Sequence, residues 1–329
     1  MTQRDPMRLL LIAIALAAAA ALPSAVNAQA AYPARPIRVL IPFPAGGAAD
    51  TIARTVGEQM AQQFGQPVVM DNRPGAGGRL ATEMLAHAEP DGYTLLLGTV
   101  GSIAVSPALY RKLPYDPQRD ILPVTQAGDV LSVMVVHPGM GVATVQQFIE
   151  WAKQRQGQVR FGSSGTGQPD HVAGELFQRL TGVHMTHVPY KGGGPALVDL
   201  IAGDLQVMFA TYVVAVPHIR SGRLKAVATT APKRQPLLGD LPAVSETVPG
   251  FGFTNWNGVF APGRTPGAIA DRLHAAVNNA LQAPEVRKRQ QGAGIEPVGS
   301  ATRAEFAQFV REDTARWAKL VREAHIQVE

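Results

Sequence analysis

The stretch Ile37-Arg38-Val39-Leu40-Ile41-Pro42-Phe43-Pro44-Ala45-Gly46-Gly47-Ala48-Ala49-Asp50 decides the fold class. Its first five residues predict a buried strand, because a short apolar run bounded by turn residues is typical of one. Pro42 and Pro44 cannot extend a ladder of hydrogen bonds, so the chain leaves the sheet there. The apolar residues that follow recur every four positions and predict an amphipathic helix: Ile52, Val56, Met60 and Phe64. A strand, a short loop and a helix form the repeating unit of an α/β fold.

The same alternation of strand and helix continues along most of the chain. The further apolar runs are Val68–Met70, Thr94–Leu97, Val133–Val136, Val159–Phe161, Met185–Val188, Leu205–Phe209 and Leu224–Ala228. This rhythm predicts parallel sheets joined by crossover helices. At the C-terminal end, a helix from about Ala304 to Glu323 is expected to face a core through four of its residues: Phe306, Val310, Trp317 and Leu320.

The length predicts two lobes, because about 300 residues exceed what one hydrophobic core usually organises. Residues 128–228 form a complete series of strands and helices between two stretches that are rich in proline or polar residues. We therefore expect an inserted second lobe at 128–228 and a first lobe built from 31–127 and 229–329. Two chain crossings between the lobes would then form a hinge.

The N-terminus predicts export from the cytoplasm. Arg4 and Arg8 precede an apolar run that ends at Leu22, and small residues follow up to Ala28. This series is typical of a cleaved signal peptide over residues 1–28, and the run is too short for a spanning helix, which needs about 20 apolar residues. With no cysteine, the chain can be neither an acylated lipoprotein nor stapled by disulfides. A monomeric periplasmic protein is the expectation.

The charge argues against a nucleic-acid partner. The formal net charge of the chain is only +5, and the Lys and Arg residues are scattered along the sequence. The densest basic run, Arg287–Arg289, lies in one short predicted helix and is typical of a solvated helix face. Nucleic-acid binding normally needs a concentrated basic stripe with a reading element, and neither is found.

The loop from Pro42 to Asp50 is the strongest candidate for function. Gly46 and Gly47 allow the backbone to approach a ligand closely. Free amides at the start of the following helix, together with the positive end of its dipole, favour an anion there. The alternative is a tight connection with Asp50 as an acidic residue of the first helical turn.

A second loop of the same kind, Phe161–His171, lies between a strand and a helix of the inserted lobe. Its hydroxyl groups could donate hydrogen bonds to a ligand: Ser163, Ser164 and Thr166. Thr99 ends a strand of the first lobe, at the edge where open α/β sheets bind ligands. A turn rich in glycine and serine is the alternative interpretation of this loop.

Catalytic and metal motifs are weak in this chain. No glycine run ends in the Lys-Ser or Lys-Thr of a phosphate-binding loop, and Ser163 lacks the flanking glycines of a nucleophile elbow. His184 and His187 would point to opposite faces of a strand, so we expect no metal and no cofactor. An exported hydrolase that uses Ser163 and His171 on an organic acid or ester is the main alternative function. A structural or adhesion module, which would bind no small molecule, is a third.

In these loops and in several further segments, the chain resembles the Bug family, the substrate-binding proteins of tripartite tricarboxylate transporters. The resemblance covers nearly the whole sequence after the leader. It is carried by the loop Pro42–Asp50 and by further matches at Tyr32-Pro33, Arg35-Pro36-Ile37, Asn72–Gly78, Asp91–Leu95, Gly174–Phe177 and Val188–Gly192.

The resemblance implies a two-lobed periplasmic binding protein that closes like a Venus flytrap and performs no catalysis. It implies a small carboxylated ligand, such as a di- or tricarboxylate, an aromatic acid, an acidic amino acid or a nicotinate-like molecule. The two membrane subunits of a secondary transporter would be the partners, and an orphan role in sensing is the alternative. The residues it implicates in ligand binding are Phe43, Ala45, Gly46, Gly47, Asp50, Thr99, Ser163, Ser164, Gly165 and His171.

One position departs from the family pattern. After the predicted strand that ends at Phe209, many relatives carry an aspartate, whereas this chain has Ala210. The resemblance therefore implies an altered specificity, with less tolerance for ligands that bear an amino group.

Overall fold

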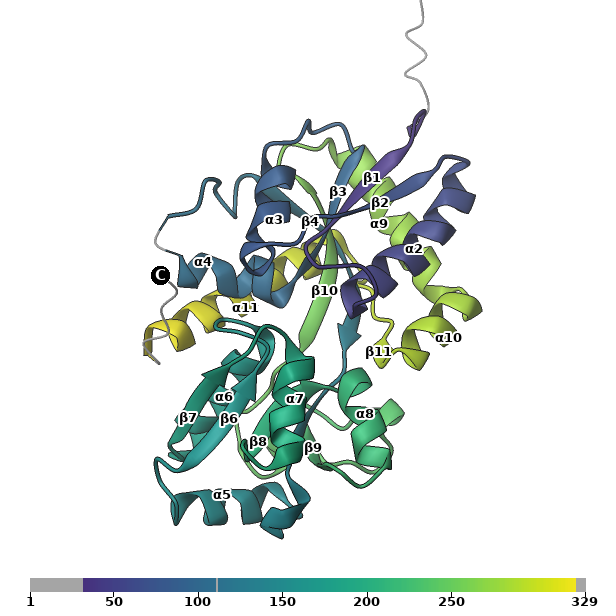
Figure 1. The fold of residues 1–329 in the computed structure, drawn as a ribbon. Coiled ribbons are helices and arrows are strands. Elements are labelled where there is room, and N and C mark those ends of the chain that lie inside the picture. Colours follow the sequence, from purple (N-terminus) through teal and green to yellow (C-terminus); the bar gives the residue numbers. More distant parts are fainter. Residues whose placement is uncertain (1–31, 111, 324–329) are drawn as a thin grey trace, which may run out of the picture. The chain divides into compact units, whose positions relative to one another are not determined.

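A computed structural model describes residues 32–110 and 112–323 of the chain (Figure 1). All the described helices and strands lie within one compact unit, Arg35–Glu329. The predicted signal peptide, residues 1–28, lies outside the described residues. Within the described part, no helix is both long and apolar enough to cross a membrane.

The first lobe is built on a six-stranded sheet with the strand order β11-β4-β10-β3-β1-β2. Its strands are β1 (Ile37–Ile41), β2 (Val68–Asn72), β3 (Thr94–Thr99), β4 (Ile121–Val130), β10 (Asn255–Pro262) and β11 (Ile295–Glu296). Its helices are α2 (Ala48–Phe64), α3 (Arg79–Ala86), α4 (Ser106–Leu109), α9 (Gly267–Gln282), α10 (Pro284–Gly292) and α11 (Arg303–Glu323). Short helical turns η1 (Ala76–Gly78) and η2 (Val100–Val105) precede α3 and α4.

The second lobe is built on a five-stranded sheet with the order β7-β6-β8-β5-β9. Its strands are β5 (Ser132–Val136), β6 (Val159–Ser163), β7 (Met185–Pro189), β8 (Val207–Thr211) and β9 (Lys225–Thr229). Its helices are α5 (Val145–Lys153), α6 (Pro169–Thr181), α7 (Gly193–Ala202) and α8 (Tyr212–Arg220), with a turn η3 (Pro138–Met140) before α5. Turns η4 (Pro236–Leu238) and η5 (Val244–Glu246) lie on the way back to β10.

All eight strands predicted from the apolar runs are present, but the expectation of parallel sheets is only partly right. The pairs β1–β2, β1–β3, β6–β7 and β6–β8 are parallel. In contrast, β10 is antiparallel to both β3 and β4, and β5 is antiparallel to both β8 and β9. β5 and β10 are the strands that the chain enters when it passes from one sheet to the other without a crossover helix, so nothing forces them to run parallel to their neighbours.

The two crossings between the sheets lie side by side. Leu131 alone separates β4 from β5, and the chain returns through residues 230–254. The amide of Thr230 in the return segment donates to the carbonyl of Ser132 at 3.0 Å. The expected boundary at 127/128 falls within β4, which stays in the six-stranded sheet as far as Val130 because it pairs there with β10 and β11.

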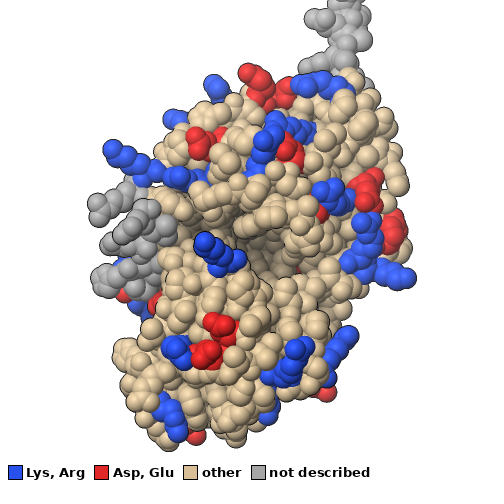
Figure 2. Space-filling model, viewed as in Figure 1, with Lys and Arg blue, Asp and Glu red and all other residues tan. Residues whose placement is uncertain are grey.

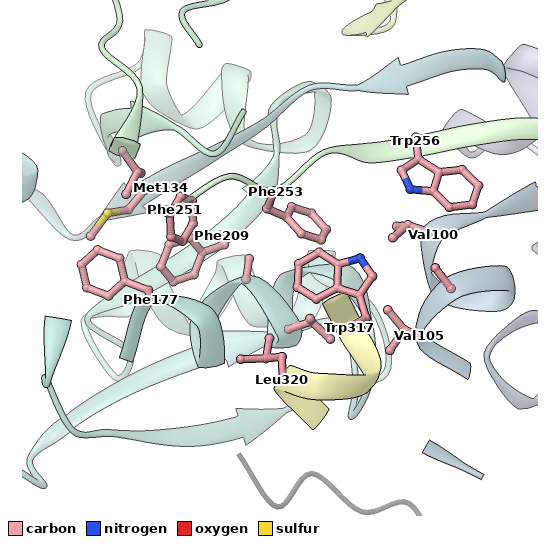
Figure 3. Close-up of a cluster of buried hydrophobic side chains, with 14 of the residues drawn as sticks. Val100, Val105, Met134, Phe177, Phe209, Phe251, Phe253, Trp256, Trp317 and Leu320 are labelled. Atoms are coloured by element: carbon pink, nitrogen blue, oxygen red, sulfur yellow. The ribbon is translucent and has the colours of Figure 1, made fainter. Parts of the chain in front are cut away.

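The last helix links the cores of the two lobes. α11 contacts both α4 and α6, and Figure 1 shows it between them (yellow). Its predicted apolar face is confirmed, since all four of the expected residues are buried. Figure 3 shows Trp317 of this helix against Phe253 of the return segment, with the ring centroids 5.5 Å apart.

A buried carboxylate holds the two tryptophans of this core. The indole nitrogens of Trp256 in β10 and Trp317 in α11 both donate to Oδ2 of Asp313, at 2.7 and 2.8 Å. Asp313 is almost fully buried, and that burial raises the pKa of its carboxyl although the two indoles and Arg316 oppose the shift. One acidic side chain therefore fixes the last helix on the first sheet.

We predict that Asp313→Ala lowers the free energy of unfolding by about 2–4 kcal/mol, because two buried indole donors lose their acceptor. Asp313→Asn is the matched control, since an amide oxygen can still accept from the indoles and no buried charge remains. Urea denaturation measures both changes. A loss below about 0.5 kcal/mol in the alanine variant would contradict this role.

Candidate functional site

A cavity of about 660 Å³ lies between the two sheets, at the ends of several strands. Figure 2 shows a hollow near the centre of this face of the molecule. The first lobe lines the cavity with Phe43, Pro44, Ala45, Gly46, Gly47, Ala48, Ala49, Thr99, Val130, Asn255 and Asn257. The second lobe lines it with Ser132, Ser164, Gln168, Pro169, Asp170, Gly193, Gly194, Met208, Phe209, Thr211, Val213 and Val214.

The loop after β1 presents the N-terminus of α2 to this cavity. Gly47 is the N-cap residue, with extended backbone angles and no side-chain hydrogen bond to the first turn. Gly46 adopts a φ of +87°, in the region that favours glycine, and a side chain there would meet nothing within 4 Å. The first amides of the 17-residue helix are therefore left to receive an anion, aided by the helix dipole.

Asp50 lies behind this loop and does not line the cavity. Its Oδ2 accepts from the amide of Gly46 at 3.0 Å and from Nε of Arg54 at 2.8 Å, and its Oδ1 accepts from Asn72 at 3.1 Å. Burial pushes the pKa of Asp50 upward, but hydrogen bonds from Arg54, Gly46 and Asn72 outweigh it and leave the pKa below its usual value. Asn72 also donates to the carbonyl of Phe43 at 2.9 Å, so this carboxylate and amide hold the loop at both ends.

The predicted residues of the loop after β6 also fall into two groups, one that lines the cavity and one that lies behind the loop. Ser164 lines the cavity, whereas Ser163, Gly165 and His171 are not among the lining residues. The hydroxyl of Ser163 lies 2.6 Å from Nε2 of His187 and 3.2 Å from the amide nitrogen of Gly165, which donates to it. Nδ1 of His171 accepts from the amide of Gly167 at 2.9 Å. These three predicted residues shape the loop from behind.

The two histidines behind this loop stack on each other, with His171 buried and His187 partly buried. The ring centroids of His171 and His187 lie 3.7 Å apart, and Phe161 packs on His187 at 4.9 Å. Burial, with a smaller contribution from His171, lowers the pKa of His187 to about 3, so its ring is neutral. Nε2 of His171 also lies 3.5 Å from Oε1 of Glu175. These two side chains are four residues apart on α6, and their contact is largely buried.

Asp170 is a cavity residue that the sequence reasoning missed. Its carboxylate accepts from the amide of Ser164 at 2.6 Å, the hydroxyl of Ser164 at 2.9 Å and the amide of His171 at 3.0 Å. Burial raises the pKa of Asp170 to about 6, despite these three donors. Its position after Pro169 in the first turn of α6 is the signal that could have found it, since acidic residues cluster at that position.

The cavity has further lining residues outside the ten that the resemblance implicates. Gly193 and Gly194 start α7, whose N-terminus also lacks a side-chain cap, and Val213 and Val214 lie in the first turn of α8. Ala210, the position that departs from the family pattern, does not line the cavity, because its side chain is fully buried in an apolar cluster with residues of α7. The next residue, Thr211, lines the cavity in its place.

Of the ten predicted binding residues, those that line the cavity are Phe43, Ala45, Gly46, Gly47, Thr99 and Ser164. In the described part of the chain, no group of three or more His, Cys, Asp or Glu side chains converges as a metal site would require. The arrangement offers backbone amides, hydroxyls and side-chain amides, which suit the recognition of a small polar anion.

Comparisons with known proteins find similar sequences and similar structures over most of the chain. Residues 52–326 match the model of the family described as "Tripartite tricarboxylate transporter family receptor". The chain is 37% identical to the protein BugT of Bordetella pertussis, over 89% of this chain and 90% of BugT. Among solved structures, a Rhodopseudomonas palustris protein with adipate is 33% identical, with a TM-score of 0.80 over 90% of this chain and all of that one. MatC from the same organism, with bound malate, is 35% identical, with a TM-score of 0.75 over 88% of this chain and all of MatC.

We predict that Asp50→Ala loosens the cavity loop, because the amide of Gly46 loses its acceptor. Hydrogen exchange followed by mass spectrometry should show at least tenfold faster exchange in the peptide that contains residues 42–50. Asp271→Ala, which removes an exposed carboxylate from its ion pair with Arg303, is the control and should leave this peptide unchanged.

The same carboxylate has a defined pH dependence. The folded pKa of Asp50 is lower than its usual value of 3.8, so its stabilising effect is present at neutral pH. This stabilisation is lost as pH falls below about 4 and then through the folded pKa of Asp50. The difference in the free energy of unfolding between wild type and Asp50→Ala should therefore become smaller over that pH range. Equal loop exchange in the two proteins at pH 7 would contradict the role of Asp50.

Asp170 should show the opposite pH dependence, because its folded pKa is raised from 3.8 to about 6. The folded protein binds a proton at Asp170 more tightly than the unfolded chain does. The resulting stabilisation is therefore fully present below pH 3.8 and is lost as pH rises through 6. Relative to Asp170→Asn, the wild-type free energy of unfolding should fall by about 2–3 kcal/mol between pH 4 and pH 7.5. Urea titrations at several pH values measure this slope, and parallel profiles for the two proteins would refute it.

Proposed function

Because the chain belongs to the tripartite tricarboxylate transporter receptor family, we propose that it is an extracytoplasmic solute-binding protein that captures a small carboxylate in the cavity between its lobes. The observation that carries this proposal is the uncapped N-terminus of α2, which lines the cavity together with Gly46 and Gly47. A carboxylate there would accept hydrogen bonds from the first amides of the helix and would meet the positive end of its dipole.

The mechanism we propose is closure of the lobes around the ligand. We propose that the second lobe is the segment predicted at 128–228 and the first lobe the segments predicted at 31–127 and 229–329, with β4 kept in the first lobe up to Val130 and β9 in the second up to Thr229. Two paired crossings allow a hinge motion, and closure hides the ligand from water and creates a surface that a partner can recognise. The proposed ligand-binding residues are Thr99 and those of the two loops, with Asp50, Ser163, Gly165 and His171 acting through the loop backbone.

We place this function in the periplasm. The signal peptide expected at residues 1–28 would be cleaved on export. The two membrane subunits of a secondary transporter are the proposed partners of the loaded, monomeric protein. The family membership supports this partnership, and a role as a receptor in sensing would use the same closed state.

The hydrolase alternative is disfavoured by burial. Ser163 has no exposed surface, and its hydroxyl is engaged with His187 and Gly165 behind the loop. A serine nucleophile needs an oxygen that can reach the substrate. The loop therefore supports ligand capture rather than covalent chemistry.

The test of this function is a thermal-shift screen of refolded protein against organic acids and their amides, followed by calorimetry. Refolding removes any ligand that copurifies. A true ligand should raise the melting temperature saturably, with a stabilisation of about 2.7 kcal/mol at a hundredfold excess over its Kd, and should remain chemically unchanged.

Gly47→Ala should abolish most of this stabilisation. The residue has φ −83°, so alanine is tolerated there, and the new methyl group would occupy the approach to the helix amides. Gly292→Ala at the end of α10 adds the same methyl group in open space outside the cavity lining and is the matched control. Consumption of the ligand would favour the hydrolase, and the absence of any binding acid or amide would refute the proposed function.

A further inference from the structure

The loop after β6 uses most of its hydrogen-bond donors internally. The sequence predicts that this loop donates to a ligand, but its backbone amides already have acceptors within the loop or the first turn of α6. The amide of Ser164 donates to Asp170, that of Gly165 to Ser163, that of Gly167 to His171 and that of Gln168 to the carbonyl of Gly165. The loop therefore offers a ligand fewer donors than its sequence predicts.

The starts of α2 and α7 differ from this loop. Neither helix has a side-chain hydrogen bond that caps its first turn, and glycines at both starts line the cavity. Open amides of this kind suit anionic groups. The carboxylates of a ligand, whether one or two, have places at these two helix starts, and the loop after β6 is left for a group of another kind.

Asp170 gives the loop after β6 an accepting surface. It lines the cavity with 8% of its surface exposed, and its carboxylate is fixed by the amide and the hydroxyl of Ser164 and by the amide of His171. The two oxygens of a carboxylate together offer about four acceptor positions, so these three donors leave one open. An ionised carboxylate cannot donate, so the group that completes it must be a donor.

The charge of Asp170 is not balanced within the cavity. Its three donors are neutral groups, and no Lys, Arg or His is found among the described residues of the cavity lining. Burial raises the pKa of Asp170 to about 6, which leaves the carboxylate ionised at pH 7.5. A buried charge is costly unless hydrogen bonds or an opposite charge compensate it. A ligand donor would supply part of that compensation.

We propose that Asp170 is a specificity-determining residue that accepts a hydrogen bond from an O–H or N–H group of the carboxylate ligand, an inference that rests on the proposed function. A hydroxyl group and an ammonium group share this chemistry. A ligand with only a methylene group at this position displaces water from Asp170 and returns no hydrogen bond, which weakens its binding. Asp170 would also provide for amino groups, which the resemblance disfavours on account of Ala210.

The test compares succinate, malate and aspartate, which share one dicarboxylate skeleton. They carry a hydrogen atom, a hydroxyl group or an ammonium group on the same carbon. Calorimetry on refolded wild-type protein at pH 7.5 should show malate or aspartate binding about tenfold more tightly than succinate, or better, because hydrogen bonds to a charged group are strong. The tighter of the two identifies the donor as hydroxyl or ammonium. A smaller advantage for both, or no binding of any of the three acids, would overturn the inference.

Asp170→Asn tests the residue itself, because it replaces one carboxylate oxygen by an amide donor at nearly constant volume. The variant should lose about tenfold in affinity for the preferred donor-bearing acid and keep its affinity for succinate within about threefold. Asp313→Asn is the matched control, since it removes a buried charge outside the cavity lining and should change neither affinity. Equal losses for all three acids would indicate a merely structural role for Asp170 and would also overturn the inference.

These outcomes separate this inference from the proposed function. If an acid of the wider panel binds, Gly47→Ala abolishes its binding and malate and aspartate have no advantage over succinate, the carboxylate site stands and the role of Asp170 falls. If no acid or amide of the panel stabilises the protein, both proposals fall together.

Discussion

The architecture depends on the backbone of one residue between two strands. Leu131 separates β4 of the first sheet from β5 of the second. Its amide donates to the carbonyl of Gly294 at 2.9 Å, and its carbonyl accepts from the amide of Tyr212 at 2.7 Å. The neighbours on either side, Val130 and Ser132, both line the cavity. The crossing therefore joins the sheets, holds the start of α8 and forms part of the site.

A second constraint acts away from the cavity. Trp317 and Leu320 of α11 share one buried cluster with Phe177 and Phe209 of the second lobe (Figure 3). An ion pair between Arg179 of α6 and Glu323 of α11 adds a contact at 2.7 Å between side chains that are partly exposed and contribute little by themselves. Packed interiors resist deformation more than open clefts do. Relative motion of the lobes is therefore easiest where the cavity separates them and hardest along α11.

Much of this structure could be predicted from the sequence, because its signals are local. The strands β1 and β6, the proline and glycine residues that end them and the helices that follow all lie within short windows. The strands β4 and β10 were missed because proline, glycine and polar residues interrupt their apolar pattern, as Pro123 and Gly128 do in β4 and Asn257 and Gly258 do in β10. Whether a loop residue lines the cavity or supports it from behind was also inaccessible. That distinction depends on partners such as Asn72 for Asp50 and His187 for Ser163, which are 22 and 24 residues away in the chain.

The site separates the recognition of charge from the recognition of shape. Helix amides carry no net charge, so they can be solvated by water in the empty cavity at little cost, whereas an unpaired buried lysine would lose hydration. Asp50 fixes the direction of these amides through Gly46 without contacting the cavity itself. The remaining wall is then free to vary, because a change at the start of α8 alters the shape and polarity of the cavity without disturbing the amides of α2. If the proposed function holds, selectivity depends on the side chains that line the rest of the cavity, which no motif in the sequence marks.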